Sequence, residues 1–306
     1  MDTSREIINW LLQGPAWLKF AVEKQLLDVS SDPEIAAKDS AIMKLRRRLN
    51  DDHLGLPALK AGRISAETIG NAYWDLFFLA DIGFTASDWD LNHDIDNILG
   101  RQVSNGTYSL DPGMAPDYYC LSAIPIATIA KIGYLDDPRV KRYIQTVWNS
   151  RCSDGGWHCE GWGNTGCPMD NLNVLMLLGQ YEQYRNNPEL GGAIDLLLKH
   201  WERRGEGWHK DGFGVGHRFQ SLEYPAIKYG ILRVLDVLSL FPSAAKTVGF
   251  RSMLNFIREK STGGKYFAEI VSDAYADFDF GHKKEPSRWI TFLVTRVEKR
   301  IALLDE

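Results

Sequence analysis

The sequence is poor in cysteine and has no long hydrophobic run; it holds four cysteines in 306 residues. No segment approaches the roughly 18 uncharged apolar residues needed to span a bilayer, so we expect no transmembrane segment. The N-terminus carries acids at Asp2 and Glu6 and does not follow the plan of a signal peptide. We therefore expect a cytoplasmic location, where the cysteines stay reduced unless they bind metal.

The chain also lacks an excess of basic charge, because its formal net charge is -5. The densest cationic run, Lys44-Leu45-Arg46-Arg47-Arg48, lies on a predicted helix with acids nearby. Such a run is typical of a solvated helix face rather than of a surface that clamps a phosphate backbone. We expect no nucleic-acid partner.

Short loops with glycine, and usually an aromatic residue, recur about every fifty residues. A period of this length indicates repeated supersecondary units, each of which buries its apolar face only by stacking on its neighbours. The loops read Gly55-Leu56-Pro57, Gly106-Thr107-Tyr108, Gly155-Gly156-Trp157, Gly205-Glu206-Gly207-Trp208 and Gly263-Gly264-Lys265-Tyr266.

Two kinds of helical segment alternate between these loops. One kind is apolar on nearly every face, which predicts a buried helix, and the other has charges at helical spacing, which predicts an amphipathic outer helix. The predicted inner segments are Ile7 to Leu27, Thr68 to Phe84, Tyr118 to Gly133, Met169 to Tyr184, Tyr224 to Leu240 and Ser287 to Leu304. The predicted outer segments are Ile35 to Leu49, Asp88 to Gln102, Val140 to Arg151, Ala193 to Arg204 and Phe250 to Lys260.

The alternation predicts an all-α fold, an incomplete α/α toroid of the α6/α6 barrel type, as one domain over residues 1–306. An inner ring of helices would surround a central cavity, with a second ring outside it. Proline is tolerated at the first helical position, and Pro116, Pro168, Pro225 and Pro286 are the predicted starts of inner helices. An open solenoid of helical pairs is the competing arrangement. Tight glycine-aromatic loops favour closure.

The segment Tyr143 to Trp157, which ends in Asp154-Gly155-Gly156-Trp157, resembles the glycine-tryptophan repeat of squalene and hopene cyclases and of protein prenyltransferase β-subunits. Arg203 to Trp208 and Lys260 to Tyr266 are weaker copies. The whole chain resembles small bacterial and archaeal proteins labelled prenyltransferase-like or squalene-cyclase-like. The resemblance implies a terpenoid cyclase fold, whereas the reaction does not follow from the fold.

Neither active site of the named enzymes is present intact. Class II terpene cyclases use an Asp-x-Asp-Asp motif, and the nearest string here, Asp94-Ile95-Asp96-Asn97, lacks the last acid and lies on a predicted outer helix. Protein prenyltransferases hold zinc with an Asp-x-Cys pair, whereas Asp117-Tyr118-Tyr119-Cys120 is one residue too long.

Three cysteines are candidates for a metal site at one mouth of the cavity. Cys120 lies at the start of the third inner segment, Cys159 in the following loop, and Cys167 just before the fourth inner segment. Thiolates bind zinc well, with His158 or Asp117 as a candidate fourth ligand. The alternatives are packed or free thiols and a Cys159–Cys167 disulfide. The candidate metal ligands are Cys120, Cys159, Cys167 and His158, and the candidate cofactor is zinc.

Polar and aromatic residues near the starts of inner segments are candidates for the cavity. Asp75, Asp170 and Glu223 are candidate catalytic acids, because a carboxylate is costly to bury unless it is paired. Arg288 could supply such a pair and leave a structural ion pair instead. Aromatic residues at helical spacing are also common in cores. The candidate cavity-lining residues are Asp117, Tyr119, Tyr73, Trp74, His217, Tyr224, Arg288 and Trp289.

Two functions fit these patterns. The first is a prenyltransferase-like or cyclase-like enzyme that acts on an apolar, isoprenoid-like small molecule in the central cavity, with a cysteine-bound metal or a buried carboxylate as the reactive centre. The second is a non-catalytic toroid that binds a lipid or a protein segment. An open pocket favours the first function, and a filled centre favours the second.

Overall fold

The described residues fold mainly into α-helices, in a computed structural model that describes residues 3–52, 72–89, 91–108, 119–158, 165–204, 217–226 and 229–305. These residues form helices, turns and isolated β-bridges, with no strand among them. The longer helices are α1 (Thr3–Leu12), α2 (Ala16–Gln25), α4 (Ser40–Asp52), α5 (Ala72–Ile82), α6 (Asn92–Leu99), α7 (Tyr119–Ile129), α8 (Pro138–Asn149), α9 (Pro168–Leu178), α11 (Gly191–Glu202), α13 (Ile231–Leu238), α15 (Val248–Arg258) and α16 (Arg288–Asp305). The short ones are α3 (Pro33–Ala37), α10 (Glu182–Arg185), α12 (His217–Gln220) and α14 (Pro242–Ala245).

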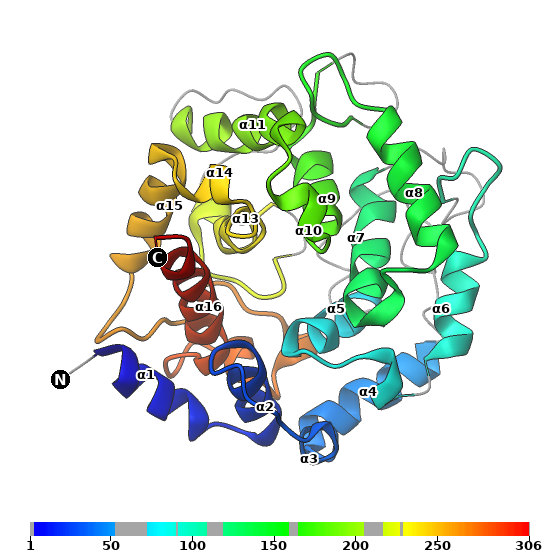
Figure 1. Cartoon of the computed structure of the whole chain (residues 1–306). Helices are drawn as coiled ribbons and strands as arrows, with labels where there is room; N and C mark the ends of the chain where they lie inside the picture. Colours follow the sequence, from blue (N-terminus) through cyan, green and yellow to red (C-terminus); the bar gives the residue numbers. More distant parts are fainter. Residues whose placement is uncertain are drawn as a thin grey trace.

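The helices form an inner and an outer set (Figure 1). In the inner set α2 contacts α5, α5 contacts α7, α7 contacts α9, α9 contacts α13, α13 contacts α16, and α16 returns to α2. The contacts between inner helices therefore close on themselves. Helices α1, α4, α6, α8, α11 and α15 lie outside them (Figure 1).

The prediction of a single inner helix over Ile7 to Leu27 is wrong. This segment forms α1 and α2, separated by a turn at Gly14, and Pro15 precedes α2 in extended conformation. Proline cannot continue a helix from the preceding turn, because it has no N–H to donate and its ring clashes with that turn. The chain therefore reverses here, and the first half of the segment becomes the outer helix α1 (Figure 1).

Capping residues explain where several helices begin. Pro168 occupies the first turn of α9, as predicted, and Asp137 accepts a hydrogen bond from the backbone N–H of Arg139 at the start of α8. The predicted start at Pro225 is wrong, because α13 begins at Ile231. Pro286 lies just ahead of α16, which begins at Arg288. Pro116 lies outside the described residues.

Three of the five predicted glycine loops lie in the described residues, and each has glycine in a left-handed backbone conformation. The loops at residues 55–57 and 205–208 lie outside the described residues. Gly106, Gly155 and Gly263 have φ angles of 92°, 82° and 58°, which disfavour residues with a Cβ atom. The indole of Trp157 is buried and donates to the carbonyl of Val147 at 2.7 Å, so this loop is tied back to α8. This loop therefore connects the outer helix α8 to the inner helix α9 and packs against α8.

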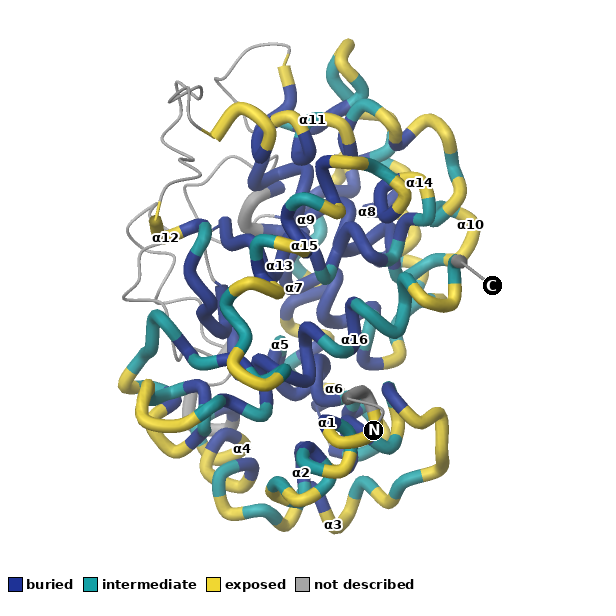
Figure 2. Tube along the Cα trace, turned by 90° about the vertical axis from the view of Figure 1, so that its left-hand side faces the viewer, coloured by how far each residue is buried: buried dark blue, intermediate teal, exposed yellow. Residues whose placement is uncertain are grey.

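Buried residues run along the middle of the molecule, whereas exposed ones follow the outer turns (Figure 2). Part of the centre is filled by aromatic rings around Phe78, which lies 5.0 to 6.2 Å from six neighbouring rings. Such edge-to-face packing adds to the stabilisation from burial. The neighbouring rings belong to Trp17, Tyr224, Tyr275, Phe278, Phe280 and Trp289.

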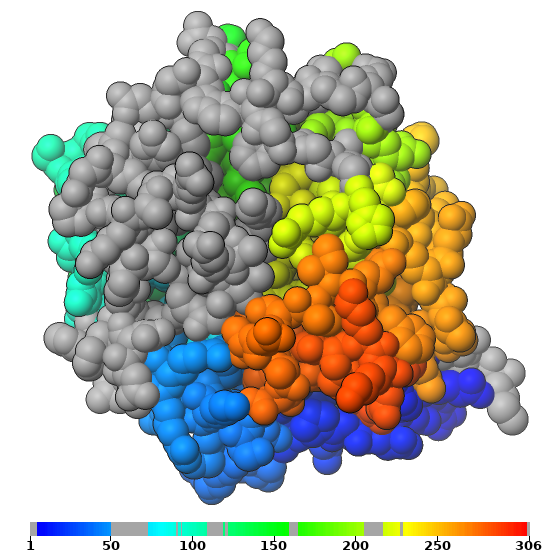
Figure 3. All heavy atoms as spheres, turned by 180° about the vertical axis from the view of Figure 1, so that it is seen from behind, coloured from blue at the N-terminus to red at the C-terminus, as the bar shows by residue number. Residues whose placement is uncertain are grey.

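The segment of residues 261–287 crosses the face of the molecule that is turned away in Figure 1 and lies beside α4 (Figure 3). Lys44 pairs with Asp277 at 2.5 Å, and Arg48 donates to the carbonyl of Ala274 at 2.8 Å. The basic run of α4 thus contributes contacts to this segment as well as a solvated face.

Candidate functional site

A cavity of about 480 Å³ lies where the inner helices end. It is lined at the C-terminal ends of α5, α9, α13 and α16 and at the π-helical turn Ala130–Tyr134 that follows α7. The volume is in the range of small-molecule sites. The lining residues are Phe77, Ala80, Asp81, Ala127, Thr128, Lys131, Met176, Gln180, Glu182, Arg185, Asn186, Asp236, Val237, Ser239, Leu240, Pro242, Arg300, Leu303 and Leu304.

Side chains satisfy the backbone carbonyls at these helix ends. The last carbonyls of a helix have no intrahelical partner, and cations near them are favoured by the helix dipole. Gln25 donates to the carbonyls of Asp81 and Ile82 at 2.8 and 2.9 Å. Arg185 donates to Gly179 at 2.8 Å, and Arg300 donates to Asp236 at 3.0 Å. The polar character of the cavity wall follows partly from this capping.

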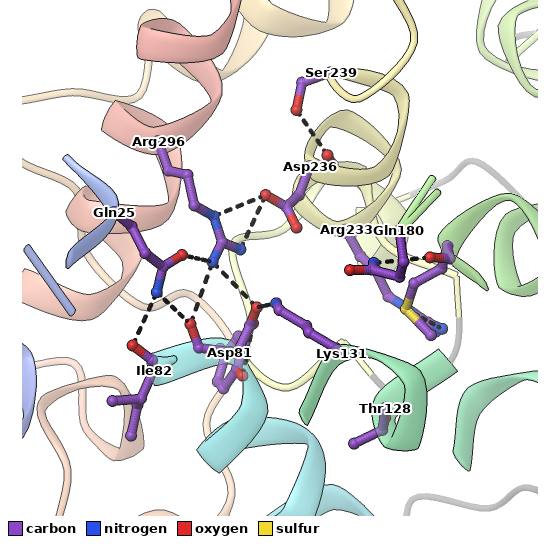
Figure 4. Close-up of polar contacts among 12 residues, drawn as sticks. Gln25, Asp81, Ile82, Thr128, Lys131, Gln180, Arg233, Asp236, Ser239 and Arg296 are labelled. Carbon is purple, nitrogen blue, oxygen red and sulfur yellow. Dashed lines mark hydrogen bonds and ion pairs between the residues drawn. The ribbon is translucent and has the colours of Figure 1, made fainter. Parts of the chain in front are cut away.

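Asp81 is the centre of a buried polar network beside the cavity (Figure 4). Its carboxylate accepts from Lys131 Nζ at 2.7 Å and from Arg296 Nη1 at 3.1 Å. The hydroxyl of Tyr224 donates to its other oxygen at 2.9 Å. Burial acts to raise the pKa of Asp81, but the charges of Arg296 and Lys131 outweigh it and hold that pKa below its usual range. Asp81 is therefore an anion in the folded state.

Lys131 both pairs with Asp81 and lines the cavity. Its side chain remains 30% exposed. Burial lowers the pKa of the Lys131 ammonium, and the charge of Asp81 opposes that change. A lysine with a lowered pKa exchanges protons more readily near neutral pH than a solvated one.

Asp236 extends the network along α13. Its carboxylate accepts from Arg296 Nε and from Arg300 Nη1, each at 3.0 Å. Arg300 also donates to the hydroxyl of Ser239 at 2.9 Å. Asp81 and Asp236 thus share Arg296, which is 2% exposed. The network links α5, the π-helical turn after α7, α13 and α16 beside the cavity.

A second, much smaller cavity of about 20 Å³ borders the same network and shares Phe77, Asp81 and Asp236 with the larger one. Glu223, Tyr224 and Arg233 are among the residues that line it. Arg233 is buried and donates to the side chain of Asn173, and burial lowers its pKa to about 10. This space is too small for an organic ligand, so the larger cavity is the better candidate site.

The three predicted catalytic acids are all buried, and they lie outside the lining of the larger cavity. The carboxylate of Asp75 accepts from the guanidinium of Arg48 and from Tyr275 at 3.0 Å. Glu223 lies 3.5 Å from Arg218. Asp170 is fully buried in the first turn of α9. Their catalytic role remains a prediction.

Half of the predicted metal site lies outside the described residues, namely Cys159 and the side chain of Cys120. Cys167 is buried, and its backbone N–H donates to the carbonyl of Trp157 at 2.7 Å. His158 is half-buried. No group of three histidine, cysteine or acidic side chains placed to hold a metal occurs among the described residues. Zinc binding therefore remains a prediction.

The predicted cavity-lining residues have varied surroundings. Trp74 packs on Phe77 and lies 5.8 Å from the guanidinium of Arg233, whereas Arg288 lies over the ring of Trp10. The hydroxyl of Tyr119 donates to Ser150 at 2.6 Å. Tyr224 and Trp289 are buried in the aromatic cluster, Tyr73 is half-buried, and His217 is exposed. Asp117 lies outside the described residues.

The residues of the network lie toward the ends of the inner segments, whereas the predicted site residues lie near the starts of those segments. Asp81, Lys131 and Arg296 are charged residues within or just after otherwise apolar runs. A lone charge in a buried helix needs a partner, so opposite charges at the same end of neighbouring helices were the available signal. By contrast, Asp96 of the Asp-x-Asp string is 63% exposed and pairs with Arg139, as expected for a surface residue.

Comparison with known proteins found no family model that matches this chain and no match among curated proteins. Among the described residues, none of the helices is both long enough and apolar enough to cross a bilayer. The cavity and the network beside it are therefore the features that bear on function.

Proposed function

We propose that residues 1–306 form one α/α toroid of the terpenoid cyclase and protein prenyltransferase type. The closed cycle of contacts from α2 through α5, α7, α9, α13 and α16 supports this architecture, as does the outer position of the alternating helices. An open solenoid would place its first and last helices far apart. Here the inner helices α16 and α2 are in contact.

We propose that the protein is a cytoplasmic enzyme that acts on a largely apolar, isoprenoid-like small molecule in the cavity at the ends of the inner helices. The observation that carries this proposal is the cavity itself, which combines apolar walls with a charged base. Phe77, Met176, Leu240 and Leu303 supply apolar surface for the body of a ligand. Nucleic acid is not proposed as a partner.

Within this function, Lys131 and Asp81 are the residues we assign to the reacting end of the ligand. The ammonium of Lys131 lies at the cavity wall and can exchange a proton with a bound group, while Asp81 holds it in place at 2.7 Å. Arg296 also pairs with Asp81 but does not line the larger cavity, so we assign it as a positioning residue. Asp75, Asp170 and Glu223 remain proposed catalytic acids outside this cavity.

The ligand site is tested by filling the cavity. Gln180 lines it and is half-buried, so Gln180→Trp places a large ring in the ligand space. Gln145→Trp on the exposed face of α8 is the matched control. We expect farnesol or farnesoate to bind with one-to-one stoichiometry in calorimetry, at least tenfold more weakly to Gln180→Trp, and unchanged to Gln145→Trp. Binding of neither compound to the unsubstituted protein would contradict the proposal.

Catalysis is tested separately by following the bound compound. Gas chromatography with mass spectrometry of farnesol incubated with the protein is expected to show a product that disappears in Lys131→Met. A ligand that binds and is recovered unchanged would instead support a non-catalytic toroid that binds a lipid or a protein segment. The ion pairs on both carboxylates of the cavity base, Asp81 and Asp236, favour that second function, because paired acids are poor proton donors.

A zinc ion held by Cys120, Cys159, Cys167 and His158 is a further proposal for the opposite end of the inner helices. Zinc bound there would act as a Lewis acid or would pin the loop to α7 and α9. Elemental analysis of the purified protein and of Cys167→Ser tests it. One zinc per chain, lost in the variant, is expected, and fully reactive thiols without zinc would exclude the site.

A further inference from the structure

The base of the cavity carries more positive than negative charge. The connected ion pairs join Asp81 and Asp236 to Lys131, Arg296 and Arg300, which gives three cations and two acids. The remaining charged lining residues, Glu182 and Arg185, lie one turn apart on α10 and balance each other in formal charge. Glu223 and Arg233, which line the neighbouring small cavity, add one charge of each sign. Cations therefore exceed acids by one in this set of described residues.

Two of the cations that line the cavity have N–H donors that make no hydrogen bond to the described residues. An ammonium has three N–H groups, and Lys131 uses one of them on Asp81. Arg300 makes its three hydrogen bonds to the described protein through Nη1, which leaves the donors on Nε and Nη2. Both residues line the cavity. Because these donors lie at the cavity wall and the site has one excess positive charge, they favour a ligand with a negatively charged acceptor.

The rest of the lining limits the shape of such an anion. Val237, Leu240, Pro242, Leu303 and Leu304 form apolar wall on the α13, α14 and α16 side of the cavity. A free inorganic anion would leave this apolar surface uncovered. A molecule with one anionic end and an apolar body would match both parts of the wall.

We infer that the cavity binds an organic acid with an apolar body, whose carboxylate accepts hydrogen bonds from Lys131 and Arg300. This inference rests on the proposed function and adds the chemical class of the ligand to it. A carboxylate supplies one negative charge and planar acceptor oxygens, which an arginine and a lysine bind through charge-assisted hydrogen bonds. The competing explanation is that the cations serve only to neutralise Asp81 and Asp236 and to cap the helix ends.

Three compounds with the same farnesyl-type chain and different ends test the inference by calorimetry at pH 8, below their micelle concentrations. We expect farnesoate to bind at least tenfold more tightly than farnesol and farnesylamine. Lys131→Met and Arg300→Met are each expected to weaken farnesoate about tenfold and to leave farnesol unchanged. Lys131→Arg, which keeps the charge, is expected to restore most of the affinity. Lys141→Met on the surface of α8 is the matched control and is expected to change nothing.

Equal affinity for the acid and the alcohol would overturn the inference and leave the ligand cavity standing. An unchanged affinity of folded Lys131→Met for farnesoate would overturn it as well. Binding of none of the three compounds would remove the proposed function together with the inference. Circular dichroism and thermal unfolding of each variant show whether the fold survives the substitution, and Lys131→Arg keeps the test valid if Lys131→Met does not fold.

Discussion

The guanidinium of Arg296 donates to the carboxylate of Asp81 at 3.1 Å, and both side chains are almost completely buried. Removal of one partner from a buried pair typically costs about 3–5 kcal/mol. Without Arg296, Asp81 still pairs with Lys131 and Asp236 with Arg300. We therefore expect Arg296→Met to lower the free energy of unfolding by about 3 kcal/mol, the lower end of that range. Urea denaturation at neutral pH, followed by circular dichroism, measures the change.

Arg258→Met provides the control for this prediction. Arg258 pairs with Glu298 at 2.8 Å, but its side chain is half exposed, and exposed pairs contribute about 0–1 kcal/mol. Equal losses for the two substitutions would show that the Asp81 network is not a special source of stability.

Asp81 gives the protein a specific dependence on acid. Its pKa in the folded chain lies below the value of about 4 for an unfolded aspartate, so its ionised form favours the folded state. This contribution is complete above about pH 4 and is lost as the pH falls below that value toward the folded pKa. Asp81→Asn removes it, so we expect a smaller loss of stability between pH 7 and pH 3 in this variant. Asp136→Asn, at a 94% exposed position, is expected to retain the full loss.

The aromatic cluster predicts a large cost for truncating Phe78. This ring is fully buried and lies 5.2 Å from Trp289 and 5.0 Å from Phe278. Replacement of a buried phenylalanine by alanine typically costs about 3–5 kcal/mol, through lost burial and the space left behind. Phe78→Ala is expected to fall in this range in urea denaturation. Phe256→Ala, at a half-buried position on α15, is expected to cost clearly less, and the reverse order would contradict the assigned core.

Asp279 is expected to act as a cap for α16. Its carboxylate accepts from the backbone N–H groups of Arg288 and Trp289 and from the hydroxyl of Ser287. Burial raises the pKa of Asp279 above its usual value despite these bonds. Loss of a capping side chain typically costs about 0.5–2 kcal/mol, so Asp279→Ala is expected to lie near the upper end of that range. Asp279→Asn keeps an acceptor oxygen and avoids a buried charge, so thermal unfolding is expected to show a smaller loss. A larger loss in Asp279→Asn would indicate that the charge matters more than the acceptor.

The alternation of apolar and amphipathic segments predicted most of the inner and outer helices, including α5, α9, α15 and α16, because burial of one or all faces leaves a direct mark on the residue pattern. The pair Gly14-Pro15 is a helix-breaking signal within the first segment. The apolar residues on both sides of it nevertheless favoured the prediction of one continuous helix. For α13, the described residues upstream of Ile231, such as Tyr224, Ala226 and Tyr229, are buried without being helical, so composition alone placed its start too early.

The amino-acid sequence by itself determined that the described residues are mainly helical and, except for α1, which of the predicted helices are inner or outer, since both follow from local spacing and hydrophobicity. Only the tertiary structure decided that Asp81, Lys131, Asp236 and Arg296 meet at one end of the inner helices beside a cavity. Their meeting depends on contacts between helices far apart in the chain, and no local pattern encodes which ends of those helices come together.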